Sequence, residues 1–220
     1  MEVGMIARNQ PRPEFTIQIV EAGTAACRLY GPAKTNVADI AKLLGKSPAS
    51  IYKIFPSKAS IWDAIAEDFF ESDLCFTAWA DGDLASVADR LKDTALGYHR
   101  LILNALRNDS QMFKLTVLAA EGDWPSFRNY LKRLHNGVGE LIRAGIAAEE
   151  FLPTKVDLAA ACFCASIGVL LDPRIIGALP SSHYEFSAEE LVCYSVSALK
   201  GIQPNRRAIP ISQRPGQRSP

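Results

Sequence analysis

The sequence predicts an all-α protein of about nine helices, with a small N-terminal three-helix domain and a larger helical C-terminal domain. Apolar residues recur three and four positions apart over most of the 220 residues, and no alternating strand pattern is found in the sequence. Gly and Pro separate these helical stretches, as at Gly31-Pro32. Within residues 35–58, two short helical patterns flank a turn at Gly45, which is the helix-turn-helix pattern.

Composition and charge indicate how the chain is divided. We expect a flexible arm at 1–13, a helix-turn-helix domain at 14–60, a helical domain at 61–200 and a Pro- and Arg-rich disordered tail at 201–220. The formal net charge is zero, yet residues 1–60 carry eight Lys or Arg against four acidic residues, and the tail adds four Arg and no acid. Residues 61–200 must therefore carry a net charge of −8. A basic module on an acidic body fits a nucleic-acid reader joined to a domain that does not contact nucleic acid.

The first helix is expected at 14–30, where Gly31-Pro32 ends it. Asn36 is placed to cap the next helix, because Asp39 follows at the spacing of a capping box. Gly45 is expected to end that helix with a positive φ.

The second helix of the motif begins after Ser47, which is expected to cap it, with Pro48 in its first turn. The residues predicted to turn inward are Ile51, Ile54 and Phe55. Those left outside are small, hydroxylic or basic: Ser47, Ala49, Ser50, Tyr52 and Lys53. Such a face suits a recognition helix in the DNA major groove, although an ordinary three-helix core would also leave a solvated face.

Residues 14–65 resemble the N-terminal domain of TetR-family transcriptional regulators. The shared positions are Gly31, Thr35-Asn36-Val37, Asp39-Ile40-Ala41, Gly45-Lys46-Ser47, Ile51-Tyr52, Phe55 and Ser57-Lys58. Three departures are Cys27 in place of the usual Phe, Pro32 in place of an aromatic residue, and Lys46 in place of a small apolar residue. The first two predict a repacked contact between the first helix and the motif.

The resemblance implies that each recognition helix, about residues 48–54, enters the major groove at one half of a palindromic operator in double-stranded DNA. The expected phosphate contacts are Thr35, Asn36, Ser47, Tyr52 and Lys58. The side chains expected to approach bases are Ala49, Ser50 and Lys53, and Pro48 belongs to the same surface. Lys46 either adds a phosphate contact or faces solvent.

Residues after the motif are expected to form helices at 58–80 (capped by Ser57), 84–107, 108–120, 125–149, 154–171 and 187–200. The helix at 154–171 is apolar all round and rich in small residues, which predicts burial on every side. Together with the helix at 187–200 it fits a four-helix bundle between two chains, and the resemblance implies the same homodimer. The alternative is a monomer with a central buried helix.

The resemblance also implies a cavity for a small effector inside the C-terminal domain. The candidate lining residues are aromatic or apolar: Trp79, Tyr98, Ile102, Met112, Phe113, Leu115, Trp124, Phe127, Tyr130 and Phe163. A hydrophobic or aromatic effector therefore fits better than a sugar or a nucleotide. The alternative for each residue is a plain core position.

Other chemistry is not indicated. The five Cys (27, 75, 162, 164 and 193) form no CxxC pair and are interpreted as reduced thiols, with a redox sensor at Cys162 and Cys164 as the alternative. The three His (99, 135 and 183) are widely spaced, so no metal or other cofactor is expected. There is no catalytic motif, no secretory signal and no apolar run long enough to cross a membrane, which favours a cytoplasmic protein.

These observations predict a DNA-binding transcriptional regulator, specifically a repressor released from its operator by a small hydrophobic or aromatic effector. Because of the departures at Cys27, Pro32 and Lys46, the alternative is a small-molecule-binding helical protein whose helix-turn-helix no longer binds DNA. An enzyme is disfavoured, since no acid–base pair or nucleophile stands at a recognisable spacing.

Overall fold

The computed structural model describes residues 14–72, 74, 86–178 and 186–201, which form eleven α-helices and no strand. This confirms the all-α prediction. The expected arm at 1–13 and the tail after residue 201 lie outside the described residues. The helices are α1 (Glu14–Tyr30), α2 (Val37–Leu43), α3 (Pro48–Tyr52), α4 (Lys58–Ser72), α5 (Val87–Asn108), α6 (Ser110–Glu121), α7 (Pro125–Ala147), α8 (Val156–Ser166), α9 (Gly168–Leu171), α10 (Pro173–Ala178) and α11 (Ala188–Leu199).

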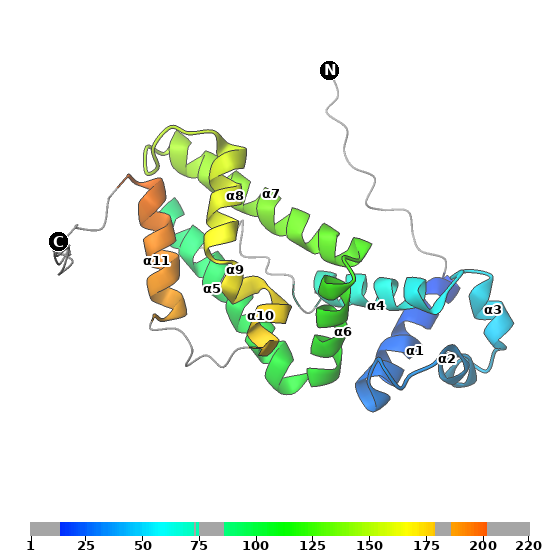
Figure 1. Cartoon of the computed structure of the whole chain (residues 1–220). Helices are drawn as coiled ribbons and strands as arrows, with labels where there is room; N and C mark the ends of the chain where they lie inside the picture. The colour runs from blue at the N-terminus through cyan, green and yellow to red at the C-terminus, as the bar shows by residue number, and fades with distance from the viewer. Residues whose placement is uncertain (1–13, 73, 75–85, 179–185, 202–220) are drawn as a thin grey trace, which may run out of the picture.

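The helices form two parts that α4 connects (Figure 1). The head consists of α1, α2, α3 and the first turns of α4, and the body contains the rest of α4 and all later helices. Within the body, α4 packs against α6 and α7, α8 packs on α7, and α11 packs on α5 and α8. Since α4 also packs on α1, one continuous helix belongs to both parts.

The turns of the head form as the sequence predicts. The backbone N–H of Asp39 donates to Asn36 Oδ1 at 3.0 Å, and that of Asn36 donates to Asp39 Oδ2 at 3.0 Å, which makes a complete capping box. Gly45 has φ 61°, a left-handed conformation that favours glycine. Ser47 Oγ accepts a hydrogen bond from the N–H of Ser50 at 3.3 Å, so it caps α3.

The inward face of α3 differs from the prediction at one residue. Ile51 is buried completely and Phe55 is buried, whereas Ile54 is 38% exposed. The prediction for Ile54 is wrong because α3 ends at Tyr52, so Ile54 no longer follows the helical spacing that brings Ile51 inward.

One predicted helix of the body is divided in the structure, and one further helix was not predicted. The stretch 154–171 divides into α8 and α9 at Ile167, whose φ of −98° and ψ of 9° leave the helical region. Ser166 Oγ donates to the carbonyl oxygen of Phe163 at 2.7 Å at this break. Helix α10 was not predicted, although Asp172 before Pro173 is a helix-start signal: the N–H of Arg174 donates to Asp172 Oδ1 at 2.9 Å.

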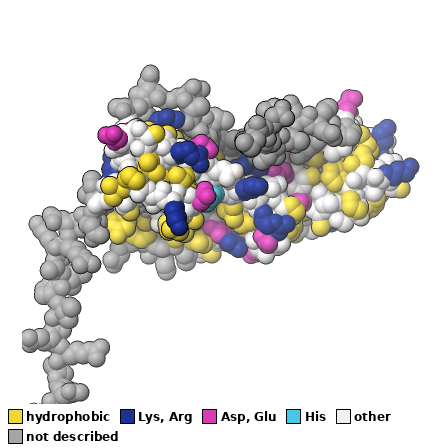
Figure 2. All heavy atoms as spheres, turned by 90° about the horizontal axis from the view of Figure 1, so that it is seen from above, with side chains coloured by type: hydrophobic (Ala, Val, Ile, Leu, Met, Phe, Trp, Pro, Cys, Tyr) yellow, Lys and Arg dark blue, Asp and Glu magenta, His cyan; other side chains and the backbone are white. Residues whose placement is uncertain are grey.

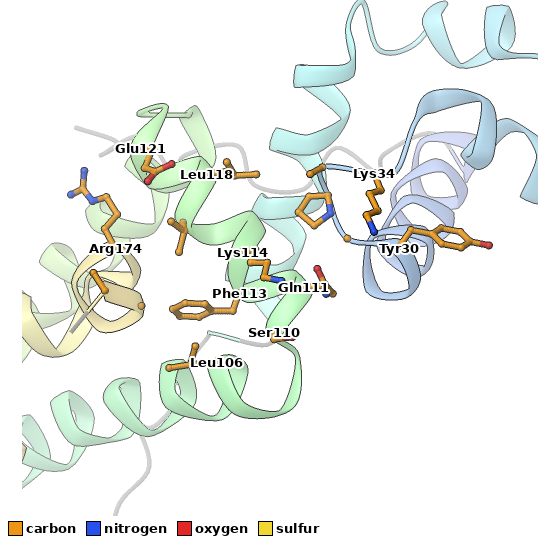
Figure 3. A pocket seen from close by; sticks show the side chains of 16 residues that line it. Tyr30, Lys34, Leu106, Ser110, Gln111, Phe113, Lys114, Leu118, Glu121 and Arg174 are labelled. Atoms are coloured by element: carbon orange, nitrogen blue, oxygen red, sulfur yellow. The ribbon is translucent and has the colours of Figure 1, made fainter. Parts of the chain in front are cut away.

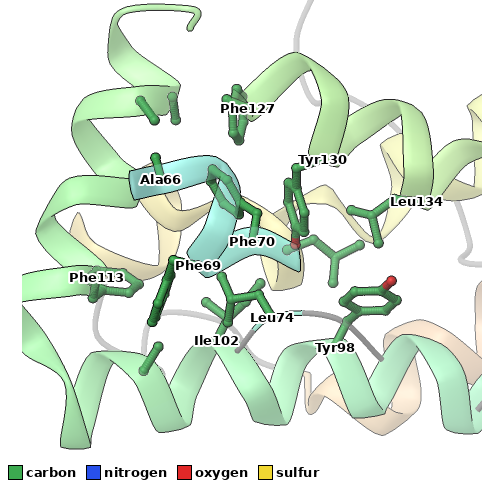
Figure 4. Packing of buried hydrophobic residues seen from close by; sticks show 14 of the residues in the cluster. Ala66, Phe69, Phe70, Leu74, Tyr98, Ile102, Phe113, Phe127, Tyr130 and Leu134 are labelled. Carbon is green, nitrogen blue, oxygen red and sulfur yellow. The ribbon is translucent and has the colours of Figure 1, made fainter. Parts of the chain in front are cut away.

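The core of the body is built around the second half of α4, which lies between α5 and α7 (Figure 4). The rings of Phe70 and Tyr130 stack with centroids 4.7 Å apart, and Phe127 and Tyr98 approach Tyr130 at 6.2 and 6.4 Å. Aromatic pairs at these distances stabilise a core beyond the area they bury. No helix among the described residues is both long and apolar enough to span a membrane.

Candidate functional site

The outer face of α3 is an exposed and largely polar surface of the helix-turn-helix. Ser47, Ala49 and Lys53 are exposed and Tyr52 is 46% exposed, whereas Ile51 beneath them is buried completely. Pro48 and Lys46 are exposed at the same end of the helix, and Ser50 is half-buried. The predicted surface residues of α3 therefore lie together, with hydroxyls at the N-terminal end and Lys53 directly after the helix.

Thr35 differs from this pattern because it is buried completely. Its hydroxyl lies 3.1 Å from the carbonyl oxygen of Ala26 and 2.9 Å from that of Gly31, where it donates a hydrogen bond within the head itself. The expected phosphate contact from the Thr35 side chain is therefore contradicted. Its role is to fix the connection between α1 and α2.

Lys58 belongs to the same connection. Its Nζ donates to the carbonyl oxygen of Thr35 at 2.7 Å and lies 4.8 Å from the centre of the Trp62 ring, a cation–π distance. Trp62 Nε1 in turn donates to the carbonyl oxygen of Pro32 at 3.2 Å. Lys58 is thus held against the backbone of the α1–α2 connection.

The departures from the family pattern at Cys27, in the last turn of α1, and at Pro32, in the α1–α2 connection, are both buried. Burial raises the pKa of the Cys27 thiol, although the hydrogen bond with Thr35 and the charge of Lys58 act in the opposite direction. The thiol is therefore a neutral core group at neutral pH. The carbonyl oxygen of Pro32 accepts from Trp62, and Cys27 belongs to the buried hydrophobic core.

Several polar contacts join the head and α4 to the body. Arg28 on α1 forms an ion pair of 2.7 Å with Asp109 before α6. Asp63 on α4 accepts a hydrogen bond at 3.0 Å from the N–H of Ser126, in the first turn of α7. These contacts could not be predicted from local sequence patterns, since each joins residues more than sixty positions apart. They couple the position of the head to that of α6 and α7.

The residues predicted to line an effector cavity are core residues for the most part. Eight of them are at most 5% exposed: Tyr98, Ile102, Met112, Phe113, Leu115, Phe127, Tyr130 and Phe163. Trp124 is half-buried, and Trp79 lies outside the described residues. Figure 4 shows several of these side chains packed against Phe69 and Phe70 of α4.

The hydroxyl of Tyr130 is a polar group inside this core. It is buried and has no hydrogen-bond partner among the described residues. Burial, the largest cause, raises the pKa of this phenol far above its usual value, and the nearby Tyr98 and Asp172 act in the same direction. Tyr130 is therefore a neutral phenol whose hydroxyl is buried near Tyr98 and Asp172.

A groove of about 730 Å³ lies on the outer side of α6, and we call it the α6 groove (Figure 3). Its lining comes from the α1–α2 connection, the end of α5, α6 and α10. The lining residues are Tyr30, Gly31, Pro32, Ala33, Lys34, Leu106, Ser110, Gln111, Phe113, Lys114, Val117, Leu118, Glu121, Arg174, Gly177 and Ala178. Of these residues, Phe113 alone was among those predicted to line an effector cavity. Sequence periodicity identifies the inward face of a helix, whereas the groove lies on the outward face of α6.

The described residues contain no group of three His, Cys, Asp or Glu that could hold a metal ion. His99 Nδ1 lies 2.9 Å from the carbonyl oxygen of Leu170, and His135 Nε2 lies 3.3 Å from that of Asp157. Burial raises the pKa of Cys164 to about 11, so its thiol is neutral near pH 7 and is a poor candidate for a redox sensor.

Comparisons with known families agree with this architecture. Residues 19–65 match the family described as bacterial regulatory proteins, tetR family. Residues 87–192 match the family described as tetracyclin repressor-like, C-terminal domain. The chain belongs to the TetR family. It is a DNA-binding transcriptional regulator, with the helix-turn-helix in the head and the regulatory domain in the body.

Solved TetR-like structures have the same fold. RolR without ligand superposes with a TM-score of 0.59 at 17% identity, covering 83% of this chain and 89% of RolR. A TetR/AcrR-family regulator from Thermobifida fusca gives a TM-score of 0.55 at 23% identity, covering 86% and 97%. BioQ, solved with its double-stranded DNA operator, gives 0.55 at 18% identity, covering 85% and 98%. No curated protein sequence matches the chain.

Proposed function

We propose that this TetR-family regulator is a cytoplasmic homodimeric repressor without catalytic activity. It binds a palindromic operator through two copies of α3 and leaves the operator when a small hydrophobic effector binds the body. The observation that carries this proposal is the outer face of α3, where exposed hydroxylic and basic side chains surround a completely buried Ile51. A helix fixed in this way presents its polar side to a major groove.

The exposed side chains form two groups, one that contacts phosphates and one that approaches bases. Asn36, Ser47 and Tyr52 contact phosphates, because their polar ends lie at helix starts or at the end of a long side chain. Ala49, Ser50 and Lys53 approach bases. Lys46 adds a phosphate contact beside Ser47, and Lys58 holds the α1–α2 connection while its remaining N–H groups face the phosphates. Thr35 acts by positioning Asn36.

The homodimer is proposed from an exposed apolar face on α8 and α11. On α8 the exposed residues Leu158, Ala161, Cys162 and Ala165 recur at helical spacing. On α11, Tyr194 is 59% exposed. Figure 2 shows hydrophobic side chains, interspersed with charged ones, on the part of the body far from the head, and a second hydrophobic group on the head itself. Small side chains on such a face allow a second copy to approach closely, so the two heads are held at a fixed separation.

The contacts that argue for effector control are those that join the body to the head and to α4. RolR has been solved in complex with resorcinol, with a TM-score of 0.59 at 16% identity. In this chain the ion pair between Arg28 and Asp109 and the bond from Ser126 to Asp63 transmit a shift of α6 or α7 to the head. An effector that moves these helices changes the separation of the two copies of α3.

Salt-dependent operator binding tests the phosphate assignments. Lys46→Ala is expected to weaken binding by about fivefold for every operator variant and to reduce the dependence of log K on log salt by about one phosphate, because it removes an exposed positive charge. Lys132→Ala, on the exposed face of α7, is the matched control and should change neither quantity. A Lys46→Ala protein with wild-type affinity and wild-type salt dependence would contradict the assignment.

A further inference from the structure

The α6 groove has an apolar floor and a polarity along its length. Phe113 and Val117 on α6 form the floor together with Leu106 at the end of α5. The lining positions on α6 run from Ser110 to Glu121, which is about 17 Å of helix at the usual rise per residue. Its volume of about 730 Å³ is within the range of small-molecule sites. An elongated apolar molecule can therefore lie along α6.

The charges of the groove are separated by end. Figure 3 shows Lys114, Gln111 and Lys34 following one another toward the head, with Glu121 and Arg174 at the opposite end. Arg174 is paired with Asp172 through bonds of 2.6 and 3.0 Å, so its charge is already balanced. Lys34 and Lys114 form no ion pair with any residue in the described part of the chain. The head end of the groove therefore has an uncompensated positive charge.

The amide of Gln111 adds a neutral hydrogen-bonding group at that end. It makes no hydrogen bond within the described ranges, and its Oε1 lies 2.5 Å from the place where a Cβ on Gly31 would be. Gly31 has φ 84°, so the α1–α2 connection can approach α6 this closely only with glycine at this position. Two lysines and an amide thus meet where the head touches α6.

We propose that the α6 groove is an effector site for an amphipathic carboxylate with an elongated apolar body. Its carboxylate lies between Lys34 and Lys114, and its apolar part lies along Phe113 and Val117. Because Lys34 belongs to the head and Lys114 to the body, the bound molecule links the two parts beside the ion pair of Arg28 and Asp109. This inference rests on the proposed function, since it gives that function an effector class and a place of action.

Calorimetric titration of the full-length protein tests the site with three probes of equal chain length: decanoate, decanol and decylammonium. Decanoate is expected to bind more tightly than decanol, and decylammonium more weakly than either. Lys114→Met keeps an apolar stem and removes the charge, so it should weaken decanoate binding by about fivefold and leave decanol binding unchanged. Lys34→Met should do the same. Lys132→Met on α7 is the matched control, outside the groove lining.

Operator binding is measured on the same proteins with and without decanoate. Decanoate should weaken operator binding of the wild type, and less so for Lys114→Met. Equal affinity for decanoate and decanol, or decanoate binding that neither lysine affects, would overturn the assignment of the groove. Lysine-dependent binding with no change in operator affinity would overturn its role as an effector site. Wild-type protein that binds the operator and no decanoate leaves the proposed function intact and refutes this inference alone.

Discussion

Replacement of Thr35 by Val separates a structural role from a DNA contact. Valine has nearly the same shape, so no cavity forms, but the hydroxyl that donates toward Ala26 and Gly31 is lost. A buried acceptor left without its donor costs about 1–3 kcal/mol. The carbonyl of Gly31 keeps the N–H groups of Lys34 at 3.2 Å and Thr35 at 3.0 Å, so we expect a loss near the lower end, about 1–2 kcal/mol.

Urea unfolding monitored by circular dichroism measures this loss, and operator binding is measured on the same samples below the transition. Thr154→Val is the matched control, because Thr154 is exposed before α8 and its change should alter the free energy of unfolding by less than about 0.5 kcal/mol. Thr35→Val should keep operator affinity within about twofold of the wild type, since it retains the backbone. Full stability with a tenfold or larger loss of operator affinity would refute the structural role and restore Thr35 as a phosphate contact.

Two substitutions and one labelling measurement test the body. Tyr130→Phe removes a buried hydroxyl without a partner among the described residues, so the free energy of unfolding should stay constant or rise by about 1 kcal/mol; a clear fall would mean that the hydroxyl is satisfied. Cys164, whose pKa is raised to about 11, should resist iodoacetamide at pH 8 and react faster as the pH rises toward 11, as peptide mass spectrometry can measure; rapid labelling at pH 7 would contradict this. Leu158→Asp, on the exposed face of α8, should give a monomer in light scattering and weaken operator binding, whereas an intact dimer would place the interface elsewhere.

Local signals made the helix-turn-helix predictable. The capping box of Asn36 and Asp39, the positive φ of Gly45 and the cap at Ser47 depend on residues within three positions of one another, and the structure has all of them. These features arise from the free backbone groups at helix ends and from the conformational freedom of glycine. Both depend on residue type at a single position or over a few positions, so they can be recognised from the sequence.

The features that could not be predicted from the sequence depend on tertiary contacts. Thr35 faces inward because Ala26 and Gly31 place two carbonyl groups beside its hydroxyl, and no periodic pattern marks such a contact. The α6 groove likewise depends on how the α1–α2 connection and α10 flank α6, and its two lysines occupy outward positions that periodicity treats as solvated. Among the aromatic residues predicted to line a cavity, Tyr98, Phe127 and Tyr130 are buried, and the first two pack against the ring of the third, so their place in an effector cavity stays a prediction.

The central claim is that two copies of α3, held by a homodimer, read a palindromic operator. Selection of bound sequences from a random double-stranded DNA library by the purified full-length protein tests it most directly. We expect enrichment of an inverted repeat whose half-sites are related by the two-fold axis of the dimer. The same selection with Tyr52→Ala should enrich that motif more weakly. Enrichment of a single, non-repeated site, or no enrichment at low salt with protein refolded free of ligand, would contradict the account.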